Sequence, residues 1–172
     1  MKATVWISAV IYLGIAVTIL TIVLSAGMPV IYRIRDRNTI EETKVIMHTL
    51  DDAIRDAAIK GPGNKRGPFV VEINKGDFTI DAENDLIIWN LENSRYLYSQ
   101  LDTVYTEGNL QILTTNSTMQ NRYNVKLMLN YSAKNIDINS NFKTLMGKYT
   151  LYITNYGSTQ EERINITIEE MS

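Results

Sequence analysis

The N-terminal part of this chain carries no charged side chain between Lys2 and Arg33. About 20 apolar residues span the hydrocarbon core of a bilayer as a helix, and this stretch is longer. A secretory signal peptide has a shorter apolar region, of about 7–15 residues, and a small-residue cleavage site. Ser25-Ala26-Gly27 resembles such a site, but the helical pattern continues beyond it. We therefore expect one long helix that is retained in the protein.

From Thr39 onwards the pattern becomes amphipathic, because apolar side chains recur at helical spacing while most charged ones lie elsewhere. We expect Asp51-Asp52 and the other adjacent acidic pairs to be solvated, since neighbours in a helix or strand point in different directions. Gly61-Pro62-Gly63 ends the helix. A continuous helix over residues 4–59 would be about 84 Å long at about 1.5 Å per residue, so its second half must lie outside a bilayer. The apolar stripe comprises Thr43, Ile46, Met47, Leu50, Ala53, Ile54, Ala57 and Ala58.

Small and hydroxyl side chains share one face of the apolar part of this helix. Such residues let helix backbones approach closely in an apolar medium, which predicts packing of the helix on copies of itself. The alternative is an ordinary membrane anchor, where such residues also occur by chance. The predicted packing face consists of Ile7, Ile11, Gly14, Thr18, Thr21 and Ser25.

Gly27 and Pro29 interrupt the apolar run. Proline removes one backbone hydrogen bond and clashes with the preceding turn. Such a defect can be accommodated in lipid or between packed helices. We expect a kink or a melted turn near residues 25–29, with the helix resuming afterwards.

Beyond Pro68 the chain shows the alternation that is typical of strands. Residues 69–73 alternate, and Lys75-Gly76 predicts a two-residue turn before the next strand. Residues 86–89 are apolar on both faces, which predicts a central strand. Residues 91–107 have no readable pattern, whereas further alternating runs extend to Ile168. Seven or more short strands predict an antiparallel sheet or a small β-sandwich.

The expected fold class is therefore α+β, with a helix followed by a β-rich head. Residues 1–60 form the long helix, which is apolar over 3–32 and amphipathic over 33–60. Residues 61–68 form a linker turn, and residues 69–172 form the head domain.

The composition excludes several function classes. A formal net charge of −2 provides no basic footprint, so we expect no nucleic-acid partner. The absence of cysteine excludes disulfides and thiolate metal sites. The single histidine, His48, does not provide a histidine metal site or a catalytic triad, and we expect it on the helix surface or packed. Residues 61–67 are glycine-rich, but no strand precedes them as in a phosphate loop. We predict a protein that is not an enzyme and has no cofactor and no metal.

Three Asn-x-Ser/Thr sequons make the head a candidate for N-glycosylation. They begin at Asn116, Asn130 and Asn165. Asn130 and Asn165 fall on the polar side of their strands, and Asn116 falls in a predicted turn. Glycans require such exposed positions.

These features together resemble a known family. The segment Lys2–Val10, the apolar helix to Tyr32, the amphipathic second half, the Gly-Pro-Gly break and the β-rich tail are similar to archaeal type IV pilins and pilin-like surface proteins. The resemblance implies a basic leader, which a prepilin peptidase removes just before the apolar helix. It implies membrane insertion first, and then an extracellular filament of identical subunits built by a pilus assembly machinery. The apolar helices would form the shared core, and the filament would serve adhesion, surface attachment or motility.

Two positions bear on how far the resemblance extends. Lys2-Ala3 matches the peptidase site with a very short leader, or else Met1 is the first residue of a trimmed chain. Bacterial pilins carry a glutamate at the fifth mature position, whereas no acidic residue precedes Asp36 here. That departure points to the archaeal branch.

The distribution of Lys and Arg around the apolar helix predicts the opposite orientation in the membrane. Three arginines follow the apolar helix and only Lys2 precedes it, which places the C-terminal side in the cytoplasm unless a basic leader has been removed. The alternative function is a solitary, single-pass surface protein whose β-type domain binds a ligand.

Overall fold

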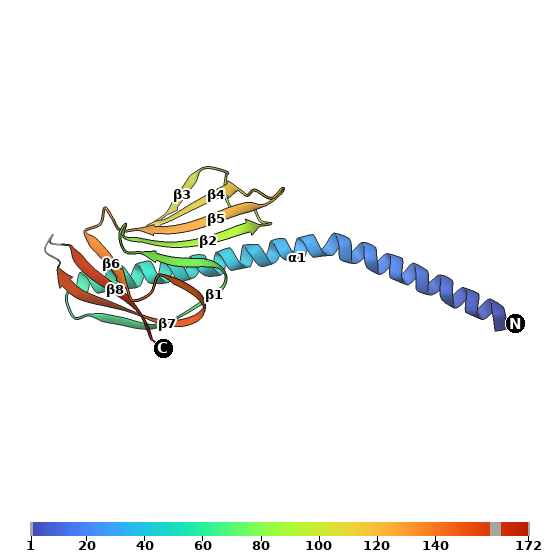
Figure 1. Cartoon of the computed structure of the whole chain (residues 1–172), viewed down its shortest axis with the longest axis horizontal. Helices are drawn as coiled ribbons and strands as arrows, with labels where there is room; N and C mark the ends of the chain where they lie inside the picture. Colours follow the sequence, from blue (N-terminus) through green and yellow to red (C-terminus); the bar gives the residue numbers. More distant parts are fainter. Residues whose placement is uncertain (1, 159–162, 172) are drawn as a thin grey trace.

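The computed structural model describes residues 2–158 and 163–171. Helix α1 (Lys2–Lys60) is continuous over 59 residues. Figure 1 shows that its N-terminal part stands free, whereas its C-terminal part lies among the strands. The predicted order of a long apolar helix followed by a β-rich head is confirmed.

The head contains one sheet of eight strands, whose spatial order is β3-β4-β5-β2-β1-β7-β8-β6. Neighbouring strands are antiparallel, except that β6 and β8 are parallel. The expected antiparallel sheet therefore forms with one parallel pair, and the described strands make no second sheet for a sandwich. The strands are β1 (Lys65–Asp81), β2 (Leu86–Ser94), β3 (Val104–Glu107), β4 (Leu110–Asn116), β5 (Tyr123–Asn130), β6 (Ile136–Ser140), β7 (Thr144–Ser158) and β8 (Ile164–Met171).

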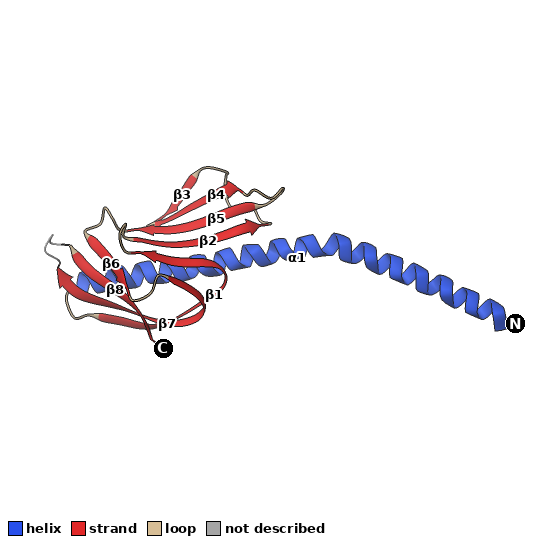
Figure 2. Cartoon of the chain, viewed as in Figure 1, coloured by secondary structure: helices blue, strands red, loops and turns tan. Residues whose placement is uncertain are grey.

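The sheet curves around the second half of α1. Figure 2 shows strands above and below the helix, and α1 contacts β2 and β5 as well as β7 and β8. A single helix thus serves as the inner layer for both arms of the sheet. This arrangement explains why the strand β2, which begins with the run 86–89 predicted to be central, is fully buried at Ile87 and Trp89.

The core lies between the sheet and the predicted stripe of α1. Six residues of the stripe are buried, and Ile46 and Ala58 are half-buried at its edges. The inward side chains of the strands alternate as predicted, for example Val125, Leu127 and Leu129 in β5. The buried members of the stripe are Thr43, Met47, Leu50, Ala53, Ile54 and Ala57.

The predicted two-residue turn at Lys75-Gly76 is wrong. β1 runs through these residues as one strand of 17 residues, and its pairing with β7 changes register between Ile73 and Phe78. A glycine with positive φ occurs in β-bulges as well as in turns, so the sequence Lys75-Gly76 does not distinguish them. Gly76 has φ of 83° and lies in a bulge. β1 also begins at Lys65, inside the range 61–68 predicted as a linker, so only residues 61–64 form the turn.

The sequence predicts either a kink or a melted turn near Gly27 and Pro29. A melted turn is not present, since both residues lie within the continuous helix. Figure 1 shows that the axis of α1 changes direction beyond the head. A proline inside a helix is an ordinary cause of such a bend.

Candidate functional site: the free segment of the helix

The free segment, which we define as residues 6–34, exposes its large apolar side chains. Trp6 is 74% exposed, and Leu13, Val17 and Ile22 are also more than half exposed. None of the residues in this segment is buried against the head. The helix is long and apolar enough to cross a membrane. An apolar surface of this extent marks a site of contact with a membrane or with protein.

The predicted packing face forms a single stripe on this segment. At about 100° per residue, its six members fall within a sector of about 80°. Gly14 lies near its middle, and apart from the adjoining residues and the nearby backbone of the helix itself, no described atom comes within 4 Å of the position that a Cβ would take there. The stripe is therefore a shallow strip along which another backbone can approach.

Hydroxyl groups in the stripe are satisfied by the helix itself. Thr18 Oγ1 donates to the Gly14 carbonyl at 2.8 Å, and Ser25 Oγ donates to the Ile22 carbonyl at 2.9 Å. Thr21 Oγ1 donates to the carbonyl of residue 17 at 2.8 Å. A polar group that is unsatisfied in hydrocarbon costs several kcal/mol, so these bonds suit an apolar surrounding.

The junction between the free segment and the head is held by a buried carboxylate. Asp36 is 5% exposed, accepts from Lys75 Nζ at 2.6 Å and accepts from the Arg95 backbone N–H at 2.7 Å. The Arg95 guanidinium lies 3.9 Å from the ring centroid of Tyr32. These contacts fix the direction in which the helix leaves the head. Asp36 is the first acidic residue after the apolar run, and that position was the only sequence signal for its role.

His48 lies on the helix surface and takes part in a small charged cluster between α1 and β3. Its Nε2 is 3.6 Å from Glu107 Oε2, and Lys44 Nζ is 2.7 Å from the same oxygen. Although partial burial opposes it, hydrogen bonds to Glu107 and Tyr98 raise the pKa of Lys44 to about 12. The hydrogen bond from Lys44 in turn lowers the pKa of Glu107. Within residues 2–158 and 163–171, no group of three or more His, Asp or Glu side chains is arranged to hold a metal ion.

The prediction that every adjacent acidic pair is solvated is wrong for Asp51. This residue is 3% exposed, because distant parts of the head supply hydrogen bonds that the local sequence does not indicate. Its Oδ1 accepts from Tyr131 Oη at 2.7 Å and from Asn109 Nδ2 at 2.9 Å. Residues 161 and 162, another acidic pair, lie outside the described residues.

The three sequon asparagines differ in accessibility. Asn116, the last residue of β4, is exposed, whereas Asn130 and Asn165 are half-buried. The side-chain oxygen of Asn130 accepts from Ser132 N at 3.0 Å, and that of Asn165 accepts from Asn139 Nδ2 at 3.2 Å. The side chain of Asn116 is thus the most accessible of the three.

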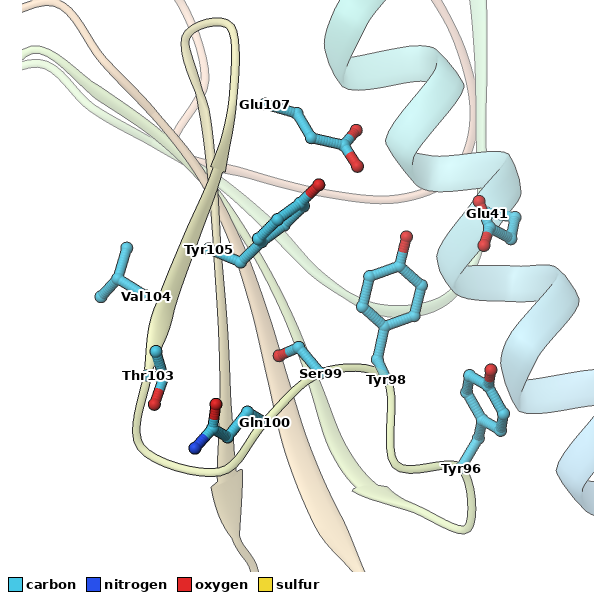
Figure 3. A pocket seen from close by; sticks show the side chains of 9 residues that line it. All are labelled: Glu41, Tyr96, Tyr98, Ser99, Gln100, Thr103, Val104, Tyr105 and Glu107. Carbon is cyan, nitrogen blue, oxygen red and sulfur yellow. The ribbon is translucent and has the colours of Figure 1, made fainter.

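A cavity beside the charged cluster was missed from the sequence, since residues 91–107 show no periodicity. It lies between α1, the loop before β3 and β3 itself, and three tyrosines line it (Figure 3). Only the fold brings residue 41 next to residues 96–107.

Comparison with models of protein families, with curated proteins and with solved structures finds no match for this chain. The fold and the site define a class: a protein with one apolar helix compatible with membrane insertion, continuous with the central helix of a β-rich head.

Proposed function

We propose that this chain is the structural subunit of an extracellular filament of the type IV pilus kind, and that it polymerises through its free segment. The observation that carries the proposal is that the apolar, exposed part of α1 is continuous with the helix enclosed by the head. The free segment would lie in the membrane before assembly and among identical helices afterwards.

The shape of the chain supports this proposal. The N-terminus lies at the end of the helix farthest from the head (Figure 1). Helices gathered side by side would therefore form an apolar core, with the heads arranged outside. Burial of apolar surface provides about 25 cal/mol per Å² of area removed from water, but a subunit leaving lipid gains little from this term. Close van der Waals packing must then hold the core, as in helix association within membranes.

The stripe is what such packing requires. Gly14 allows close approach of two backbones, and the hydroxyls of Thr18 and Thr21, which follow it in the stripe, present no unpaired donor to a neighbour. A filament of this kind serves adhesion or surface attachment, and N-glycans on the head, at Asn116 first, would face outward. An assembly machinery in the membrane would be the partner before export.

The test compares two substitutions of equal character on opposite sides of the free segment. Gly14→Leu fills the stripe, whereas Ala16→Leu places the same final side chain about 200° further around the helix. In cells that assemble the protein, we expect Gly14→Leu to reduce sheared filaments at least tenfold, while Ala16→Leu keeps them. Electron microscopy and quantification of sheared material measure the effect.

Both variants should accumulate in membranes at the wild-type level, since neither position contacts the head. Normal filaments from Gly14→Leu would contradict the packing face. Wild-type subunits found only in membrane extracts, never in sheared material, would favour the solitary anchored protein instead.

A further inference from the structure

The cavity at the side of the head has the size and lining of a small-molecule site. Its volume is about 450 Å³, within the common range of about 300–1,000 Å³ for ligand pockets. Figure 3 shows the rings of Tyr98 and Tyr105 projecting into the same hollow, with Glu107 at one end and Gln100 at the other. Glu41 lies on α1 at the side of the cavity, so both the helix and β3 line it.

The tyrosines form walls that are accessible to a ligand. Tyr105 is 52% exposed although it lies in a strand, and Tyr98 is half-buried. Tyr96 packs edge-on against Tyr98, with ring centroids 6.3 Å apart. This contact supports the ring of Tyr98. The ring of Tyr105 remains accessible, because no described residue covers it. A tyrosine ring offers an apolar face together with a hydroxyl.

Charges already present at the cavity argue against a charged ligand. Lys44 Nζ lies 6.0 Å from the ring centroid of Tyr98 and pairs with Glu107, so a cation of the chain occupies that position. Arg37 similarly lies 5.8 Å from the ring centroid of Tyr96. An incoming cation would meet these two positive groups, and an anion would meet Glu41 and Glu107.

The remaining polar groups suit hydroxyls that both donate and accept. The side chains of Gln100 and Tyr105 have no hydrogen-bond partner within the described parts of the chain, and each offers a donor and an acceptor. The carboxylate of Glu41 accepts only. A pyranose ring has an apolar C–H face that stacks on an aromatic ring and a rim of hydroxyls around it. We propose that this cavity binds a neutral saccharide, with Tyr98 and Tyr105 as stacking walls and Gln100 and Glu41 as hydroxyl partners.

The proposal does not depend on polymerisation, so it is tested on the full chain in micelles. The detergent should be a polyoxyethylene ether, because maltoside and choline headgroups would themselves compete for the cavity. The probes are maltose, lactose, mannobiose and chitobiose, observed by saturation-transfer NMR and titration calorimetry. We expect at least one disaccharide to bind, and Tyr105→Ala to weaken its binding at least tenfold.

A matched control and a conservative variant separate recognition from folding. Tyr156→Ala removes another tyrosine that is more than half exposed, from β7 and away from the cavity, and should leave saccharide affinity unchanged. Tyr105→Phe retains the stacking face and should bind better than Tyr105→Ala. Equal loss in Tyr156→Ala and Tyr105→Ala would overturn the assignment to this cavity.

Two further arms decide the ligand class and its source. Binding of choline or lysine methyl ester without binding of any saccharide would overturn the proposal, as would no binding of any probe. Protein made without N-glycans should bind added saccharide. If glycosylated protein binds it only after its glycans are removed, the sugars are N-glycans of this protein, and if both forms bind equally, they come from outside.

Discussion

Asp51 and Tyr131 form a buried polar contact between α1 and the head. Both are buried, and burial together with the hydrogen bond to Asp51 raises the pKa of the Tyr131 hydroxyl. Arg55 Nε lies 3.2 Å from the second oxygen of Asp51, so the carboxylate has a charged partner as well. A buried charge is tolerated only when it is paired and hydrogen-bonded, which makes each partner important for stability.

Tyr131→Phe should lower the free energy of unfolding by about 1–3 kcal/mol, because the carboxylate loses a buried donor while the ring still fills its space. Tyr156→Phe is the matched control. Its hydroxyl also donates to a carboxylate, at 2.8 Å from Glu169, but the side chain is 61% exposed, and we expect a change within about 0.5 kcal/mol. Denaturant unfolding of the full chain in micelles measures both. Similar losses in the two variants would show that the buried network does not hold the helix in place.

The long strand β1 connects the two arms of the sheet around α1. Its C-terminal part pairs with β2, and β7 pairs with its N-terminal part and, beyond the bulge, with Phe78 and Thr79. Trp89 packs against the bulge at Gly76, and its Nε1 donates a hydrogen bond to the Lys75 carbonyl at 3.0 Å. A bulge increases strand twist and bends the strand, which is what wrapping a helix requires.

Gly76→Ala should destabilise the head by about 3 kcal/mol or more, since positive φ is combined with a steric clash. A Cβ at this position would lie 2.7 Å from the Asn90 carbonyl oxygen and 2.8 Å from Trp89 Nε1. Gly108→Ala is the control: φ there is 62°, and apart from the two neighbouring residues no described atom lies within 4 Å of the added Cβ. We expect the control to cost about 1–2 kcal/mol from backbone conformation alone. Thermal unfolding followed by circular dichroism compares them, and equal midpoints would refute the role assigned to the close approach of Trp89.

At the scale of the whole molecule, the two parts of α1 have different roles. Residues 6–34 contribute no buried side chain to the head, whereas Asp36 and Ile40 are buried in its interior. The folded head and the apolar surface that would assemble are thus physically separable, although no linker lies between them.

A fragment of residues 33–172 should therefore be a soluble monomer with the strand content of the full chain. A fragment of residues 49–172 loses the buried Ile40, Thr43 and Met47, and loss of Ile40 and of Met47 costs about 2–5 kcal/mol each, so it should not fold. Size-exclusion chromatography and circular dichroism distinguish the two. An unfolded 33–172 fragment would mean that the free segment stabilises the head.

Local pattern was enough to predict the helix, its apolar and amphipathic parts, and most strands. Helical and strand periodicities depend on neighbours within a few residues, and hydrophobic burial follows them. Val125, Leu127 and Leu129 accordingly point inward as expected. The same patterns gave a wrong prediction at Gly76, because a glycine between alternating runs is found both in turns and in β-bulges.

What the linear pattern left open depends on contacts between distant residues. The order of the strands, the wrapping of one sheet around α1, the burial of Asp36 and Asp51, and the tyrosine-lined cavity each join residues that are tens of positions apart. Their free energies arise from packing and hydrogen bonds formed only when the chain closes on itself. The amino-acid sequence alone therefore establishes that this protein has an apolar helix and a β-rich head. The tertiary structure determines how the head packs around that helix and where a ligand would bind.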